Sequence, residues 1–113
     1  MAVDQNQIRE LKRYYPNLSA VDDGGMEFIF ISPLILPPGC EPASVDGFLC
    51  PARRDNYVSR LFLSVKVSHK GPGQHWNANG VVIAGRQWWA VSWQTKENLT
   101  LLGMVLAHLE AFT

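Results

Sequence analysis

Both ends of the chain carry hydrophobic residues at helical spacing. Near the start, Ile8, Leu11 and Tyr15 lie three and four residues apart, so they line one face of a helix. Asp4 is a suitable N-cap for this helix, and Gln7 completes a capping-box-like pair with it. The residue after Tyr15 is a proline, which ends the helix.

The C-terminal segment repeats this pattern from about residue 98 to residue 112. Leu102, Val105, Leu109 and Phe112 recur there at helical spacing, which predicts a second helix. A helix at each end leaves the strands of the fold to the middle of the chain.

Aromatic and β-branched residues, which are typical of strands, dominate three segments between the two helices. These segments are MEFIFIS (26–32), SVDGFLC (44–50) and RLFLSVKVS (60–68). In the third, leucines and valines alternate with polar residues, which predicts one buried and one exposed face. The intervening PLILPPGCEP (33–42) has too many prolines for a central strand and must be a loop or an edge.

Two further segments precede the second helix. Residues 69–80, HKGPGQHWNANG, read as a loop because of their glycines, proline and asparagines. Residues 81–93 read as an extended, mostly buried stretch with Trp89, Val91 and Trp93 on one side. The order is then helix, three-strand antiparallel meander, long loop with an extended stretch, and helix, which predicts a single α+β domain over residues 1–113.

The composition fits a folded domain and points to no special partner. Of 113 residues, 47% are hydrophobic and 18% are charged, which argues against disorder. Ten basic and ten acidic side chains balance, so we expect neither nucleic acid nor a membrane surface as partner. The longest apolar run is too short to span a bilayer, and no signal peptide is visible, so we expect a cytoplasmic protein with free thiols.

The residues that could carry chemistry show no familiar spacing. No glycine loop suited to phosphate is present, and the histidines and cysteines lack zinc-site spacing, so we expect no metal and no cofactor. Cys50 ends a predicted strand and reads as a small buried hydrophobe. Cys40, between prolines, is expected to be more exposed, and His108 is expected at the surface or boundary of the second helix.

An ordered set of motifs resembles the ubiquitin-conjugating enzyme (UBC) fold, most closely its divergent bacterial branch, prokaryotic conjugating-enzyme family E. The motifs are GGMEF (24–28), CPARRDNYVSRLFLS (50–64), HWN (75–77) and WQTKENLTLLGMVLAHLEAF (93–112). HWN stands where the family has His-Pro-Asn, with Trp76 in place of the proline. The resemblance implies a conjugating-enzyme fold with a long active-site loop, and it covers essentially the whole chain.

The chain departs from the family at the catalytic cysteine. Counting forward from His75 or back from Trp93 places that position at Gly85, beside Arg86, and aligning on Asn79 and Gly80 places it at Ile83. No cysteine follows Cys50, so neither alignment places a cysteine at this position. On this resemblance, residues 80–93 are the active-site flap, held to the core by Trp89 and Trp93, and the standard thioester nucleophile is absent.

The resemblance implies three fates for the nucleophile. Asn77 takes the family's role of oxyanion donor, and His75 shapes the loop. The nucleophile is then a hydroxyl, Ser92 or Ser68, which forms an oxyester; or it is Cys50; or there is none.

The resemblance also implies partners, namely a ubiquitin-like protein and its activating enzyme. The basic face of the first helix resembles the surface that docks the activating enzyme, although a solvated helix face is the commoner meaning of such charges. The candidate contacts are Arg9, Lys12, Arg13, Arg53, Arg54 and Tyr57. Two alternatives stay open: a non-catalytic UBC-like module that binds these partners, and an unrelated α+β domain with a buried aromatic core.

Overall fold

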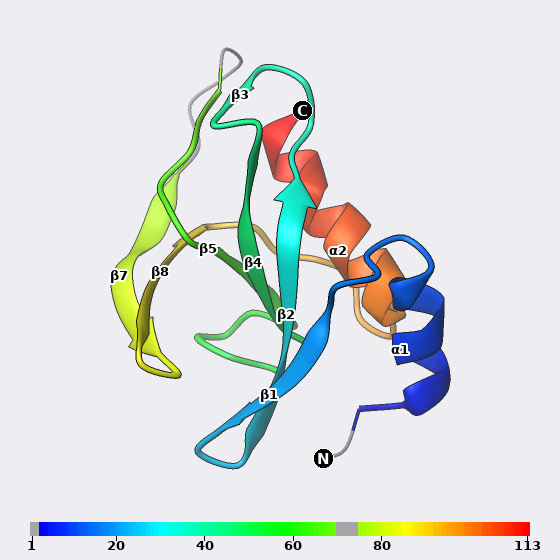
Figure 1. Cartoon of the computed structure of the whole chain (residues 1–113). Coiled ribbons are helices and arrows are strands. Elements are labelled where there is room, and N and C mark those ends of the chain that lie inside the picture. The colour runs from blue at the N-terminus through cyan, green and yellow to red at the C-terminus, as the bar shows by residue number, and fades with distance from the viewer. Residues whose placement is uncertain (1–2, 70–74) are drawn as a thin grey trace.

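Two helices cover one face of an antiparallel sheet (Figure 1). The computed structural model of the protein describes residues 3–69 and 75–113. Helix α1 spans Gln5–Lys12, and helix α2 spans Leu101–Leu109 and continues into a 3-10 turn, η1, at Glu110–Phe112. The α+β class predicted from the sequence is confirmed.

The described residues form eight strands in two sheets. In chain order they are β1 (Ser19–Asp23), β2 (Met26–Ile35), β3 (Cys40–Glu41), β4 (Ser44–Cys50), β5 (Arg60–Leu63), β6 (Ser68–His69), β7 (Trp76–Ile83) and β8 (Arg86–Val91). The larger sheet has the order β1-β2-β4-β5-β8-β7, and β3 pairs with β6. Its first four strands are an antiparallel meander; β7 then forms the far edge, and β8 returns beside β5.

The sequence pattern does not predict strand β1. Its residues, SAVDD, are mostly polar and exposed, so no hydrophobic alternation marks them, yet they pair with the first half of β2. Strand β2 runs past residue 32 through Pro33 to Ile35. Beyond Phe30 it pairs only with β4, so Pro33 lies at an edge of the sheet, one of the two placements expected for it.

Strand β4 matches the predicted segment, but the prediction of one strand over residues 60–68 is wrong. Strand β5 ends at Leu63, and all four of its residues are buried, including Arg60. Strand β5 lies between β4 and β8, and both of its faces are covered. The alternation of hydrophobic and polar residues therefore does not distinguish a buried face from an exposed face in this strand. Val65, which the alternation placed on the buried face, is 42% exposed.

Residues 76–91 form a β-hairpin, which replaces the long loop expected from the resemblance. Strands β7 and β8 pair antiparallel and turn at Ala84 and Gly85, both with positive φ. The predicted loop over 69–80 is wrong for His69, which belongs to β6, and for residues 76–80, which belong to β7. Residues 70–74 of it lie outside the described residues. Figure 1 shows this hairpin as the left-hand edge of the sheet.

Trp88 holds the hairpin in the core, and the prediction that Trp89 and Trp93 do so is wrong. Trp88 is 1% exposed, its ring stacks on Phe48 with centroids 4.7 Å apart, and its Nε1 donates to the Ile83 carbonyl at 3.1 Å. Successive side chains of a strand point to opposite faces, so Trp89 lies on the other face of β8 and is half-buried. Trp93 is 36% exposed.

The sheet separates two hydrophobic clusters. On the helix side, Leu11 of α1 and Val105 of α2 belong to one buried cluster, so both helices pack on the same face. On the other side, the rings of Phe28, Phe48 and Trp88 form a stack with centroid spacings of 4.7 Å. This second core is aromatic, and it lies across the sheet from the helices.

The N-terminus of α1 is capped as predicted, but Gln7 has a different role. Asp4 Oδ1 accepts from the Asn6 amide at 2.8 Å. The Gln7 side chain does not complete a capping box; its Oε1 accepts from the Leu101 amide at 3.1 Å. Gln7 therefore ties α1 to the first residue of α2.

Two side chains expected near the surface are buried. Cys40 is 5% exposed, and its Sγ lies 3.7 Å from the Phe112 carbonyl oxygen. His108 is 5% exposed, and its Nε2 lies 2.9 Å from Ser59 Oγ, which is 3.2 Å from Thr95 Oγ1. Both expectations are wrong. Cys40 pairs with β6 in the small sheet and packs against η1, and His108 lies on the buried face of α2.

The buried His108 makes stability depend on pH. Burial, and then the charge of Arg60, lowers the pKa of His108 from 6.5 to about 4. Between these values the unfolded chain binds a proton that the folded chain does not. We therefore expect full stability above pH 6.5 and a loss of about 3 kcal/mol as the pH falls to about 4. Urea unfolding across this range measures the loss, and His108→Gln is the control: an equally steep slope in that variant would contradict the assignment.

Candidate functional site

Five polar side chains meet near the start of β7 and the end of β8, and we call them the Ser92 cluster: Ser92, Tyr57, Asn77, Arg60 and Asp55. Ser92 Oγ lies 2.7 Å from Tyr57 OH, and Asn77 Nδ2 donates to the same phenol oxygen at 2.8 Å. Asn77 Oδ1 accepts from Arg60 Nη2 at 2.5 Å, and Arg60 Nη1 donates to Asp55 Oδ2 at 3.1 Å. The cluster joins three residues singled out from the sequence, Ser92, Asn77 and Tyr57, with two that were missed.

A tight turn before β5 supplies two members of the cluster. Arg54 and Tyr57 form an isolated bridge, with backbone hydrogen bonds of 3.0 and 2.8 Å between them. The two residues between them, Asp55 and Asn56, have φ values of 54° and 70°, which suits a two-residue hairpin turn. The turn directs both Asp55 and Tyr57 onto Arg60.

Backbone pairing beyond β8 fixes Ser92. The Ser92 amide donates to the His75 carbonyl at 2.6 Å, which extends the ladder between β7 and β8. Two residues later, Gln94 Oε1 accepts from the Val58 amide at 2.9 Å and Gln94 Nε2 donates to the Asn56 carbonyl at 3.2 Å. Segments far apart in the sequence are thus joined on both sides of the Ser92 hydroxyl.

Arg60 is the buried centre of the cluster. Its guanidinium lies 4.5 Å from the centroid of the Tyr57 ring and 5.4 Å from that of Phe62, and Nη2 also donates to the Val91 carbonyl at 3.2 Å. The side chain is 3% exposed, and a guanidinium stays charged when buried, so these contacts compensate its desolvation. Because Asn77 Oδ1 accepts a hydrogen bond from Arg60, the amide nitrogen of Asn77 faces Tyr57.

The cluster offers a hydroxyl, a phenol and an amide to a substrate. Asn77 is exposed and Ser92 is half-buried, so both can be reached from solvent. One N–H of Asn77 Nδ2 donates to Tyr57, which leaves the second for an oxyanion. Among the described residues, no imidazole or carboxylate has a hydrogen bond to Ser92 Oγ, so Tyr57 is its titratable neighbour.

The other candidate nucleophiles lie outside this cluster. Cys50 is fully buried, with its Sγ 3.4 Å from the Ala52 carbonyl oxygen and 3.6 Å from Met26 Sδ. Burial raises the pKa of the Cys50 thiol, which disfavours the thiolate. Ser68 lies in the small sheet, where its Oγ donates to the Glu41 carbonyl at 3.5 Å.

Gly85 and Arg86 lie at the tip of the hairpin, remote from Ser92. A strand rises about 3.3 Å per residue, so about 20 Å of β8 separates Arg86 from Ser92. Arg86 Nη2 donates to Asp46 Oδ2 at 2.8 Å, and its guanidinium lies 4.7 Å from the Trp88 ring centroid. The hydrogen bond from Ser32, and then Arg86, lowers the pKa of Asp46. The structure therefore separates the position where the family has its cysteine from the Ser92 cluster.

The predicted basic contacts differ in how they are used. Arg9 and Lys12 are exposed on α1 and Arg13 is exposed at its C-cap, and Arg9 donates to Asn6 Oδ1. Arg53 forms an exposed ion pair with Glu97 at 2.8 Å. The Arg54 guanidinium lies 5.6 Å from the Phe62 ring centroid and its Nε is 3.8 Å from Asp55 Oδ2. Arg53 and Arg54 thus have partners within the chain.

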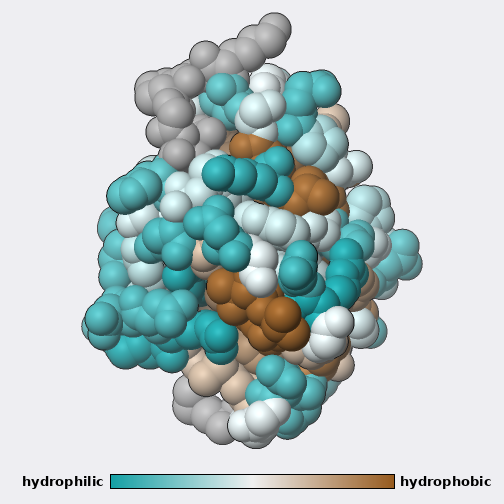
Figure 2. All heavy atoms as spheres, turned by 90° about the vertical axis from the view of Figure 1, so that its left-hand side faces the viewer, coloured by the Kyte–Doolittle hydropathy of each residue, from teal (hydrophilic) through white to brown (hydrophobic). Residues whose placement is uncertain are grey.

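Other kinds of site have little support in the described parts of the chain. In those parts, no group of three or more His, Cys, Asp or Glu side chains is arranged to hold a metal ion, and no helix has the length and apolar character needed to cross a membrane. Figure 2 shows the side of the molecule on which the β7–β8 hairpin lies. This face is mostly hydrophilic, and its hydrophobic patches lie apart from one another.

Comparison with known proteins gives no relative to this chain: no protein-family model, no curated protein and no solved structure matches it.

Proposed function

We propose that this chain is a UBC-like component of a bacterial ubiquitin-like protein conjugation pathway, in which Ser92 accepts the C-terminus of the modifier as an oxyester. The observation that carries the proposal is the contact of Ser92 Oγ with Tyr57 OH at 2.7 Å, beside the Asn77 amide. The chain lacks a cysteine after Cys50, and the hydroxyl of Ser92 is the nucleophilic group that lies with the motif asparagine.

The arrangement of elements supports the same assignment. An N-terminal helix, an antiparallel meander and a C-terminal helix follow one another, and both helices pack on one face of the sheet. The basic side chains Arg9, Lys12 and Arg13, on α1 and at its C-cap, are exposed and form no ion pair among the described residues, so they are free to contact an activating enzyme. These partners belong to the cytoplasm, which is the location we propose for the chain.

The proposed step exchanges a thioester for an oxyester. Ser92 Oγ attacks the carbonyl carbon at the C-terminus of the modifier, which the activating enzyme holds as a thioester; a C–O bond forms and the C–S bond breaks. The Ser92 proton passes by way of Tyr57 OH to the departing thiolate, which leaves as a thiol. The free N–H of Asn77 donates to the oxyanion of the tetrahedral intermediate. An acceptor amine later cleaves the oxyester, and Ser92 regains its proton.

A second candidate, a non-catalytic module that binds the modifier or the activating enzyme, has one observation in its favour. No histidine or carboxylate among the described residues has a hydrogen bond to Ser92 Oγ, and a serine hydroxyl is a weak nucleophile without a base. The polar groups of the cluster bond to one another, as they would in a structural network.

Reconstitution with the activating enzyme, ATP and ubiquitin-like protein from the same source tests the proposal. We expect an intact-mass adduct that resists thiol and is lost in mild base. Ser92→Ala removes it, because the hydroxyl is gone, and Asn77→Ala slows its formation about 100-fold. Ser68→Ala, a matched serine variant in the small sheet, and Cys50→Ala leave it unchanged. A thiol-labile adduct, or one that survives in Ser92→Ala, contradicts the proposal; binding without any adduct favours the second candidate.

A further inference from the structure

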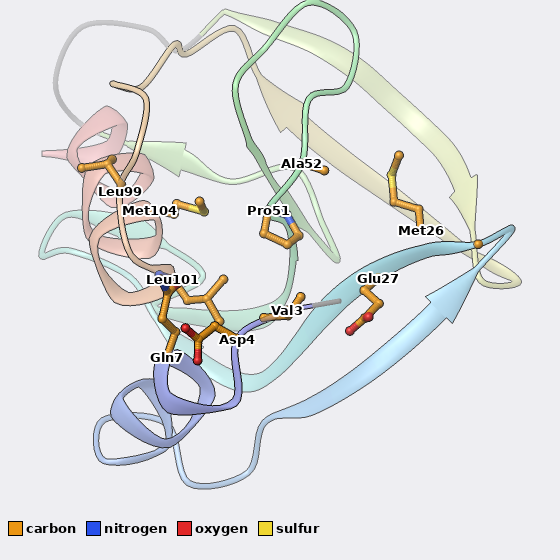
Figure 3. A pocket seen from close by; sticks show the side chains of 11 residues that line it. Val3, Asp4, Gln7, Met26, Glu27, Pro51, Ala52, Leu99, Leu101 and Met104 are labelled. Atoms are coloured by element: carbon orange, nitrogen blue, oxygen red, sulfur yellow. Dashed lines mark hydrogen bonds between the residues drawn. The ribbon is translucent and has the colours of Figure 1, made fainter. Parts of the chain in front are cut away.

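A hollow of about 320 Å³ opens between the two helices and strand β2, away from the Ser92 cluster. Figure 3 shows Met104 and Leu99 on one side of the hollow and Met26 and Glu27 on the other. Pro51 closes a third side, from the segment that follows β4. Its size is at the lower end of the range for small-molecule sites.

Apolar side chains make up most of the wall. Val3, Met26, Pro51, Leu101 and Met104 line the hollow. Such a surface favours the apolar part of a ligand, because burying it removes hydrocarbon from water.

Among the described residues, the charged groups at this wall are acidic. Asp4 and Glu27 line it, and none of the described lining residues is Lys, Arg or His. Asp22 lies directly opposite Glu27 in the pairing of β1 with β2, which adds a third carboxylate nearby. Among the described residues none of these three acids forms an ion pair, whereas Asp46, Asp55 and Glu97 do.

We propose that this hollow binds a small amine with an aliphatic tail. The tail occupies the apolar wall, and the ammonium group lies beside Glu27, which is half-buried and forms no ion pair among the described residues. Carboxylates placed opposite each other repel, so a cation between Asp22 and Glu27 also relieves that repulsion. This inference does not rest on the function proposed for Ser92, since the two sites share no residue.

Titration of the full chain with hexylamine, followed by amide NMR shifts, tests this inference. We expect saturable shifts at Glu27, Ala52, Leu101 and Met104. Hexanoate has the same tail with the opposite charge, so we expect it to bind at least about tenfold more weakly. Glu27→Gln should weaken hexylamine binding by roughly three- to fivefold, the range for a partly exposed ion pair.

Glu110→Gln is the matched control, because it removes the same charge from the exposed end of α2 and should leave the affinity unchanged. Ala52→Leu, which fills the hollow, should abolish the saturable shifts. Equal binding of hexanoate, equal effects of the two glutamate variants, or the absence of saturable shifts at these amides would each overturn the inference.

Discussion

Trp88→Ala should destabilise the protein by about 4 kcal/mol, as expected for removing a large buried aromatic side chain. Trp88 is 1% exposed; its ring stacks on Phe48 at 4.7 Å and meets Phe30 edge-on at 6.4 Å. Its Nε1 also satisfies the buried Ile83 carbonyl at 3.1 Å, so alanine leaves both a cavity and an unpaired acceptor. The midpoint of urea unfolding measures the loss.

Trp93→Ala is the matched control for this prediction. Trp93 is 36% exposed, and its single hydrogen bond from Nε1 goes to the Ala107 carbonyl at 2.8 Å. We expect a loss of only about 1 kcal/mol from this exposed position. A loss in Trp93→Ala as large as that in Trp88→Ala would contradict the role of Trp88 in holding the hairpin.

Arg60→Ala should cost about 4 kcal/mol, because it empties a buried site and leaves hydrogen-bond acceptors without their donor. Asn77 Oδ1 and the Val91 carbonyl lose their donor, and the Tyr57 ring loses the guanidinium beneath it. Asp55 returns to water at little cost, since its side chain is 56% exposed. Arg60→Lys keeps the charge but not the planar fork, so we expect about half of this loss.

Two measurements separate this role from simple packing. Urea unfolding gives the loss of stability, and the Asn77 side-chain amide resonances report whether Asn77 keeps its orientation. Arg53→Ala is the control, because Arg53 and Glu97 are 60% and 66% exposed, and such a pair contributes at most about 1 kcal/mol. An Arg60→Ala protein as stable as Arg53→Ala, with unmoved Asn77 resonances, would contradict the role of Arg60.

The sequence indicates those elements whose pattern reflects one buried face. Leu11 and Val105 mark the two helices in this way, whereas Ser44–Cys50, which is buried on both faces, is indicated by its aromatic and β-branched residues; the structure has all three. The sequence does not indicate strand β1, because a polar edge strand has no alternation of hydrophobic and polar residues. In β8, the choice between Trp88 and Trp89 depends on which face of the strand turns inward, and the pairing of β8 with distant β5 decides this.

The candidate site is predictable only in part, for a related reason. The resemblance singles out Asn77 and Ser92, and the structure brings both to Tyr57. It does not indicate Arg60, because an arginine in an alternating segment reads as solvent-facing, and only the covering of both faces of β5 makes it central. Gly85 shows the converse: alignment places it at the reactive position, whereas hairpin pairing carries it to the far end of β8.

The most direct test of the account is to locate the bond to the modifier. Trypsin cleaves after Lys and Arg, so Ser92 leaves in the peptide QWWAVSWQTK (87–96), Ser68 in 67–70 and Cys50 in 14–53. Digestion of the reconstituted adduct at neutral pH, followed by fragmentation, identifies the modified residue. We expect the remnant of the modifier on Ser92, as a base-labile ester in peptide 87–96. A remnant in either of the other two peptides, or none in any, would contradict the role assigned to Ser92.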